Sequence, residues 1–205
     1  MAAATSIARY LLNEAASGTT PTTVTDDQGS NDLSITYNSN GNWTSIGAGN
    51  GLDFLKTAAT ANAMSVELAD IANNGNIGSS LASATEASVL MRVDLDAGSD
   101  LGARVFQIGV AGGNGDFAVT LNASGYLIAR WDAENIVAVT ETETVVTGGI
   151  KTIAIVVDTT EATGINRIKF YVDGSQITTT YNELAQNRAL TSVNNSNRYI
   201  TLMDR

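Results

Sequence analysis

Apolar and polar residues alternate along most of the chain, and turn-forming residues separate the alternating runs. A period of two places every second side chain on the same side of an extended backbone, so it predicts half-buried β-strands. The clearest strands are predicted at residues 88–95, 103–111, 135–146, 151–158 and 168–172, and a pair within 117–132 is joined at Asn122–Gly125. Less regular strands are predicted at 6–14, 33–38 and 47–55 and, with one helical turn, in 62–85.

About a dozen short strands with turns every 8–12 residues are typical of an antiparallel sandwich or jelly roll. No amphipathic helices of 10–15 residues separate the strands, which disfavours a parallel βαβ sheet. The length of 205 residues suits one domain over 1–205. We therefore predict an all-β, two-sheet antiparallel jelly-roll sandwich.

The stretch "RIKFYVDG" (167–174) is the sharpest local pattern. It places Ile168 and Phe170 on one face, with Val172, and the polar Lys169 and Tyr171 on the other. Asp173 and Gly174 follow, and both tolerate the positive φ that a two-residue hairpin turn requires. The preceding "KTIAIVVD" (151–158) is apolar at nearly every position, so it is predicted to be a central strand covered on both faces.

Composition restricts the possible functions of the chain more than it restricts the possible folds. The chain has no histidine and no cysteine, which excludes a Ser-His-Asp triad, thiolate zinc sites and disulfides. Its net charge is -10, which argues against binding nucleic acid or anionic membranes. The first 20 residues lack the basic and long apolar runs of a secretion signal, and no run is long enough to insert into a membrane.

Several motifs, in order, resemble the laminin-G-like form of the concanavalin A-like lectin/glucanase superfamily. They are "ARYLLNEAASGTT" (8–20), "VTDDQGSNDLSI" (24–35), "GNGLDF" (49–54), "ASVLMRVDL" (87–95), "GIKTIAIVVD" (149–158) and "INRIKFYVDGSQI" (165–177). The chain departs from the family pattern at residues 152–154, where Thr-Ile-Ala replaces the usual tryptophan and histidine. The resemblance implies a jelly roll, and members of the superfamily bind ligands or carry structural roles.

The same resemblance implies one more strand after the segment "NRYITLMDR" (197–205), beside the first strand. The chain is then a fragment, or it is completed by a further part of the molecule or by a neighbouring subunit. Because an uncovered sheet edge favours association, we expect other protein subunits as partners.

Two acidic clusters are candidates for Ca²⁺, an ion that some laminin-G-like domains bind at a loop rim. The first is Asp94, Asp96 and Asp100, and the second is the stretch Asp26–Asp32. The competing interpretations are a solvated strand end and a turn rich in Asp and Asn, and both are preferred. No other cofactor is expected.

Aromatic side chains can stack on the apolar faces of sugars. The candidate glycan contacts are Trp43, Trp131 and Tyr171, with Tyr126 and Tyr181 as further aromatic residues, and each can equally be a packing residue. A glycoside hydrolase needs two carboxylates across a cleft, and the dense acidic strand around Glu141 and Glu143 lacks the pattern that such enzymes of this fold carry.

The sequence thus predicts a non-catalytic protein, not an enzyme. The preferred function is a structural, decoration or adhesion jelly roll at the surface of a bacteriophage virion, since a virion protein needs no export signal. The alternative is a lectin-like, carbohydrate-binding module of a cell-surface or secreted protein, and a glycoside hydrolase or lyase is the remote third. The expected location is the virion surface or the extracellular space.

Overall fold

The computed structural model describes the chain in separate segments. They comprise residues 6, 9, 23–28, 33–34, 41–45, 52–56, 66–67, 85–94, 103–109, 117–122, 124–131, 138–142, 146–158, 160–183 and 199–204. Most of the strand predicted at 6–14, and most of the region 62–85, lie outside these residues. Every strand pair that the structure describes is antiparallel.

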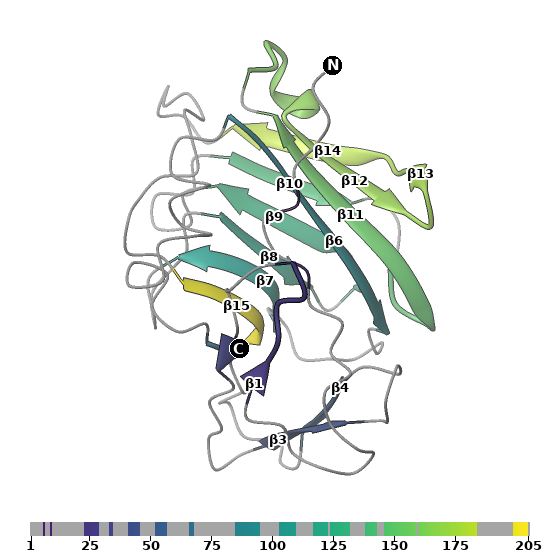
Figure 1. Ribbon diagram of the computed structural model, residues 1–205. Coiled ribbons are helices and arrows are strands. Elements are labelled where there is room, and N and C mark those ends of the chain that lie inside the picture. The colour runs from purple at the N-terminus through teal and green to yellow at the C-terminus, as the bar shows by residue number, and fades with distance from the viewer. Residues whose placement is uncertain are drawn as a thin grey trace.

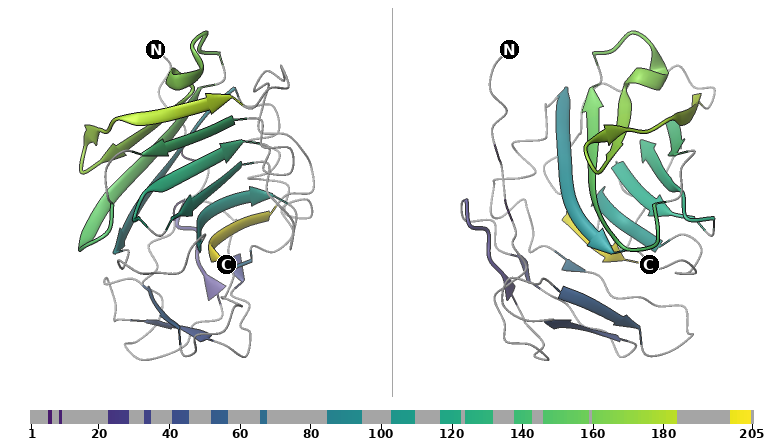
Figure 2. Two further views of the ribbon diagram at one scale, coloured as in Figure 1. Left: turned by 180° about the vertical axis from the view of Figure 1, so that it is seen from behind. Right: turned by 90° about the vertical axis from the view of Figure 1, so that its right-hand side faces the viewer.

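Two larger sheets stack face to face as a β-sandwich (Figures 1 and 2). The seven-stranded sheet contains, in spatial order, β14 (Thr179–Glu183), β10 (Ala138–Thr142), β9 (Leu127–Trp131), β8 (Phe117–Leu121), β7 (Ala103–Gly109), β15 (Tyr199–Asp204) and β5 (Val66–Glu67). The four-stranded sheet contains β13 (Ser175–Gln176), β12 (Ile168–Val172), β11 (Ile150–Asp158) and β6 (Glu86–Asp94). The predicted two-sheet antiparallel sandwich is confirmed, and its jelly-roll connectivity stays a prediction.

Two short pairs complete the described strands. β1 (Thr23–Val24) pairs with β2 (Leu33–Ser34), and β3 (Gly41–Ser45) pairs with β4 (Leu52–Lys56) below the sandwich in the view of Figure 1. Strand β3 lies between the stretches 33–38 and 47–55, in which strands were predicted, and was not itself predicted. One 3-10 turn, η1 (Gly164–Asn166), lies between β11 and β12.

The core lies between the two sheets, and in β11 and β12 it follows the alternation of the strand. From the four-stranded sheet, Ile153, Ile155, Val157, Ile168 and Phe170 are buried. Strand β8 faces them from the other sheet, and all five of its residues are buried. Each fully buried Phe, Leu or Ile contributes roughly 1.5–3 kcal/mol of hydrophobic stabilisation, so these strands fix the relative position of the sheets.

A β-bulge interrupts the alternation in β7. Arg104 pairs with Thr120, and Phe106 pairs with Val119, so Val105 is an extra residue on its strand. Val105 and Phe106 are both buried, although strict alternation places them on opposite faces. A bulge bends the strand locally and increases its twist, which here lets two consecutive side chains enter the interior.

The prediction that residues 151–158 form a central strand is confirmed, because β11 pairs with β6 on one side and β12 on the other. The prediction that both faces are covered is wrong. The core-facing side chains are buried, whereas Ala154 and Val156 on the opposite face are half-exposed and Thr152 is exposed. The seven-stranded sheet covers one face only, and the other face is available for contact.

Candidate functional site: the outer face of the four-stranded sheet

The outer face of the four-stranded sheet consists of the side chains that point away from the core. Because Ile153, Ile155 and Phe170 point inward, their sequence neighbours must point outward. These outward side chains are Ser88, Leu90 and Arg92 from β6; Thr152, Ala154 and Val156 from β11; Lys169 and Tyr171 from β12; and Gln176 from β13. Every one of them is half-exposed or exposed.

One row of this face crosses all four strands. Tyr171 pairs with Gln176 on β13 and with Ala154 on β11, and Ala154 pairs in turn with Leu90 on β6. Neighbouring strands are about 4.8 Å apart, so the row spans roughly 14 Å. Leu90 is the most exposed large apolar residue that the structure describes, with 74% of its surface accessible.

The row has an aromatic ring near one end, a small residue in its centre and an exposed aliphatic side chain at the other end. The side chain of Ala154 is a single methyl group, so it projects less from the sheet than Tyr171 and Leu90 on either side of it. An aromatic ring beside an open, shallow surface can stack on a sugar ring or on an apolar side chain of a partner. The amide of Gln176 beside the ring can donate and accept hydrogen bonds.

Charged side chains surround this row. The ammonium of Lys169 lies 3.4 Å from a carboxylate oxygen of Glu161, and the Nε–H of Arg167 donates to the backbone carbonyl of Glu161 at 2.8 Å. At the other end, Lys151 lies 3.7 Å from Asp173. Such exposed pairs contribute little to folding stability. The Lys169–Glu161 pair places charge beside the outer face, whereas Lys151 shares the parity of the core-facing Ile153.

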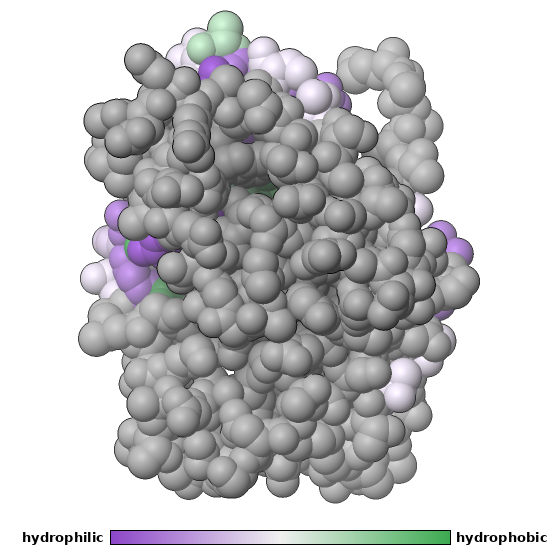
Figure 3. Space-filling model, turned by 90° about the vertical axis from the view of Figure 1, so that its left-hand side faces the viewer, coloured by the Kyte–Doolittle hydropathy of each residue, from purple (hydrophilic) through white to green (hydrophobic). Residues whose placement is uncertain are grey.

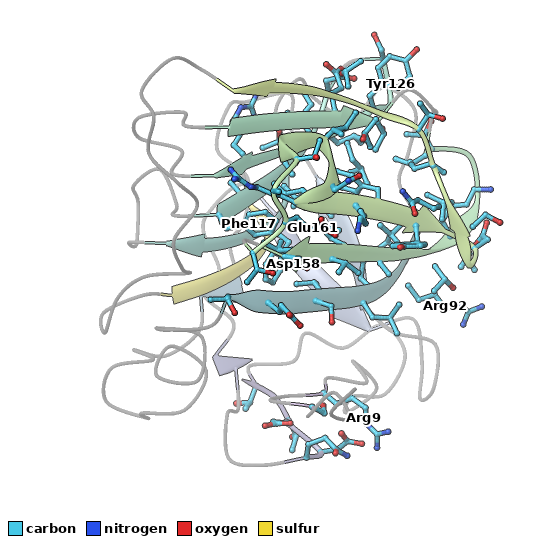
Figure 4. All side chains as sticks on the ribbon, turned by 90° about the horizontal axis from the view of Figure 1, so that it is seen from above. Arg9, Arg92, Phe117, Tyr126, Asp158 and Glu161 are labelled. Atoms are coloured by element: carbon cyan, nitrogen blue, oxygen red, sulfur yellow. The ribbon has the colours of Figure 1, made fainter. Side chains whose placement is uncertain are left out.

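Asp158 fixes the turn that leaves the sheet at this rim. Its carboxylate accepts hydrogen bonds from the hydroxyl of Thr160 at 2.6 Å and from the Thr160 backbone N–H at 2.9 Å. These bonds, the hydroxyl first, lower the pKa of Asp158 below its usual 3.8. Figure 4 shows Asp158 and Glu161 at one end of the sheet and Arg92 toward the other.

The three candidate glycan contacts are not brought together. Tyr171 lies on the outer face of the four-stranded sheet, whereas Trp131 ends β9 in the seven-stranded sheet and Trp43 lies in β3. Trp131 pairs with Phe117, and Trp43 pairs with Phe54. The structure describes only the backbone of both tryptophans, so their role as glycan contacts stays a prediction.

The other aromatic candidates also lie elsewhere. Tyr126 is half-exposed in the β8–β9 turn, and Tyr181 lies in β14, where its backbone alone is described. In the same turn Asn122 donates a 2.7 Å hydrogen bond from its side-chain amide to the carboxylate of Glu141. Glu143, the second acid considered for glycoside hydrolysis, lies outside the described residues.

The acidic cluster at 26–32 uses its first two carboxylates for internal bonds. Asp26 is buried, and its Oδ1 accepts from the backbone N–H groups of Arg9 at 2.9 Å and Gln28 at 3.0 Å. Asp27 accepts from the guanidinium Nε–H of Arg9 at 2.7 Å and forms an ion pair with its Nη2. The hydrogen bond from Arg9 lowers the pKa of Asp27 below its usual 3.8.

These bonds tie Asp26 and Asp27 to Arg9. Both carboxylates accept hydrogen bonds from donors of the protein itself. The rest of this cluster, from 29 to 32, lies outside the described residues, as do Asp96 and Asp100 of the other cluster. Among the residues that the structure describes, no three acidic side chains gather in a metal-binding arrangement. Ca²⁺ binding at either place stays a prediction.

Sequence reasoning missed Leu90 as a surface residue. The stretch 87–95 is apolar at many positions, which indicated only that it was a strand. A finer signal was present, because Glu86, Ser88 and Arg92 share the parity of Leu90 and are polar. Their shared parity predicts that Leu90 faces solvent.

Figure 3 shows that the described residues reaching the surface on one side of the molecule are mostly hydrophilic. On β6 itself, the exposed Leu90 lies between the exposed polar residues Ser88 and Arg92. No helix within the described segments is long and apolar enough to cross a membrane.

Comparison with known proteins adds little to this picture. No protein-family model matches the chain, and no curated protein matches it. Among solved structures, the full extracellular region of zebrafish Gpr126/Adgrg6 aligns with 59% of this chain at 14% identity and a TM-score of 0.37. The alignment spans 15% of that extracellular region. The functional argument therefore depends on the outer face itself.

Proposed function

We propose that this protein is a non-catalytic module that holds a macromolecule through the outer face of its four-stranded sheet. We propose further that it works as a structural, decoration or adhesion component at the surface of a bacteriophage virion, in contact with other protein subunits. The observation that carries the proposal is the exposed row from Tyr171 through Ala154 to Leu90. Exposed apolar surface with a polar rim marks interaction sites on soluble proteins.

One feature of the sequence and one of the structure support a holding function. With no histidine and no cysteine, the chain lacks the commonest general base and the thiol nucleophile. The wide rigid sheet also suits a module that must present one surface without rearranging, because both sheets share a continuous buried core.

The virion proposal is tested on purified bacteriophage particles from the organism that encodes this chain. We expect mass spectrometry to find the chain at a fixed copy number per particle. We also expect cryo-electron microscopy to show its density at symmetric positions on the particle surface. A chain that sediments only with the soluble fraction, while the particles lack it, contradicts a role in the virion. That outcome would not decide whether the outer face binds a partner, which the glycan array described next tests separately.

The second candidate is a carbohydrate-binding module of a cell-surface or secreted protein. One observation favours it: the ring of Tyr171 is half-exposed beside the amide of Gln176, which supplies both stacking and hydrogen bonding. On a glycan array, the wild-type protein should bind a defined set of sugars, and Tyr171→Ala should lose that binding.

Tyr126→Ala is the matched control, since Tyr126 is also a half-exposed tyrosine but lies in the turn between β8 and β9 of the other sheet. It should bind the same sugars as the wild type. A silent array with a folded protein contradicts the carbohydrate candidate. Equal loss in both variants would place the glycan contact away from the outer face.

A further inference from the structure

Strand β6 is the outermost described strand on one side of the four-stranded sheet (Figures 1 and 2). All nine of its residues pair with β11 on one side. On the other side, the part of the chain that the structure describes supplies no strand. No described strand takes the alternate backbone N–H and C=O groups along that side, and an unpaired edge of this kind can accept another extended segment.

The exposure of the side chains agrees with an uncovered β6. The core-facing Ala87, Val89, Met91 and Val93 are only half-buried, whereas Ile153 and Ile155 at the same depth on β11 are fully buried. On the outer face, Glu86, Ser88, Leu90 and Arg92 are all exposed. A long, regular edge strand with an exposed leucine at its centre is a template for strand addition.

We propose that a second copy of this chain docks there, with the two β6 strands antiparallel and a two-fold axis through Val89. This pairing places Glu86 of each copy opposite Arg92 of the other. Ser88 then lies opposite Leu90, and Ala87 lies opposite Met91. The result is a continuous eight-stranded sheet with both cores on the same side.

Charge decides this register among those that symmetry allows. A two-fold axis perpendicular to the sheet keeps core-facing residues opposite core-facing residues, so the centre must be a residue of β6. Centring on Leu90 pairs all nine residues, but it places Glu86 opposite Asp94 twice. Like charges directly opposite each other destabilise an antiparallel pair, whereas opposite charges stabilise it.

Centring on Val89 instead forms two Glu86–Arg92 pairs and still pairs seven residues. The two Leu90 residues then lie diagonally across the junction, about 7–8 Å apart and somewhat closer at Cβ, where long side chains still touch. The exposed apolar surface of Leu90 is thereby partly removed from water. The dimer follows from β6 alone and does not depend on the proposed function.

Cysteine cross-linking reads the register directly, because the natural chain has no cysteine. Opposed Cα atoms in an antiparallel pair are about 4.5–5.5 Å apart, within the range of a disulfide. Val89→Cys should therefore form a covalent dimer under mild oxidation. Leu90→Cys should not, because its two copies are offset by two residues and lie beyond roughly 7 Å.

Circular dichroism of both reduced variants checks that each one folds. The proposal is overturned if Leu90→Cys cross-links in preference to Val89→Cys. It is equally overturned if both variants cross-link to the same extent, or if neither does at protein concentrations near 1 mM, a range that covers weak self-association.

Sedimentation of charge variants tests the two ion pairs on the otherwise natural surface. Glu86→Arg should raise the dimer dissociation constant about tenfold or more, because two attractive pairs become repulsive. Arg92→Glu should do the same, and the double variant should return close to the wild-type value. In the register centred on Leu90, Glu86→Arg would instead tighten the dimer.

A wild-type protein that stays monomeric up to about 1 mM also overturns the proposal. In that case hydrogen exchange on β6 identifies the competing occupant. Slow exchange along the whole of β6 in the monomer would mean that a segment of the same chain covers the edge. Fast exchange at alternate residues would mean that the edge is free.

Discussion

The backbone N–H of Leu127, at the start of β9, donates a 3.0 Å hydrogen bond to the hydroxyl oxygen of Thr142, at the end of β10. Both residues are buried, with Thr142 1% exposed and Leu127 fully inaccessible. A buried backbone N–H without an acceptor is costly, so this hydroxyl satisfies the backbone where the ladder between β9 and β10 ends. Thr142 is thus a buried polar residue with a structural role.

Replacing Thr142 by Val keeps the shape of the side chain but removes this acceptor. We expect Thr142→Val to lower the free energy of unfolding by about 1–3 kcal/mol, the cost of one unsatisfied buried group. Urea unfolding followed by circular dichroism measures the change. Thr180→Val, at an exposed position on the neighbouring strand β14, should stay within about 0.5 kcal/mol of the wild type. Equal losses in both variants would contradict the role of the Leu127–Thr142 bond.

Phe170 and Tyr171 are adjacent in sequence and point to opposite sides of β12. Phe170 is fully buried between the sheets, so Phe170→Ala should cost about 3–5 kcal/mol of stability. Tyr171 is half-exposed on the outer face, so Tyr171→Ala should cost clearly less than Phe170→Ala. Thermal and urea unfolding of the two variants measures the difference. A greater loss in Tyr171→Ala would show that the strand is turned over.

Gly174 has a φ of +82° in the turn between β12 and β13. A Cβ added there meets nothing within 4 Å, so any cost of Gly174→Ala comes from the backbone conformation and not from a collision. We expect a loss of about 1–2 kcal/mol. Ser175→Ala, at the next and exposed position, is the control and should be nearly neutral. A neutral Gly174→Ala would argue against the positive φ in solution.

The ion pair between Arg9 and Asp27 should make stability depend on pH. The hydrogen bond from Arg9 lowers the pKa of Asp27 in the folded state, so the unfolded chain binds this proton more readily. Stability from the pair is therefore complete above the ordinary value of 3.8 and is lost as the pH falls through the lowered folded value. The free energies of unfolding of wild type and Asp27→Asn, measured with urea across this pH range, should become equal in acid.

Salt provides the control for the same pair. Both side chains retain access to solvent, at 57% for Arg9 and 27% for Asp27, so mobile ions screen their attraction. The difference between wild type and Asp27→Asn at neutral pH should shrink in about 1 M NaCl, where the Debye length is roughly 3 Å. If the difference in unfolding free energy between wild type and Asp27→Asn grows as the pH falls, or does not change with salt, the stabilisation by the ion pair is contradicted.

Local patterns were enough to predict much of the four-stranded sheet. The alternation at 168–172 and the Asp173–Gly174 pair predicted strand β12, its buried face and its turn, and the structure confirms each of them. The turn at 122–125 was also predicted. There the Asn122 side-chain oxygen accepts from the backbone N–H groups of Ser124 and Tyr126 at 2.9 and 3.0 Å, and Gly125 has a φ of +80°. These features arise from residues close together in the chain, whose conformation depends mainly on their own chemistry.

The site was harder to predict, because its parts come from distant segments. Tyr171 meets Ala154 and, beyond it, Leu90 only because β6 pairs with β11 across more than fifty residues. The aromatic residues grouped from the sequence as glycan contacts belong instead to three different sheets. Composition could show that aromatic side chains were available, but it could not show which of them share a face.

By itself, the sequence determined the strand character of the chain, the inward and outward faces of its clearest strands and the absence of histidine and cysteine chemistry. Only the tertiary structure decided that β11 is open on one face, that β6 is an edge among the described strands and that Val105 forms a bulge. The physical reason is the range of the interactions. A period of two is set residue by residue along the backbone. The choice of partner strand depends on burying complementary faces far apart in sequence, and that choice leaves Leu90 exposed beside Ala154 and Tyr171.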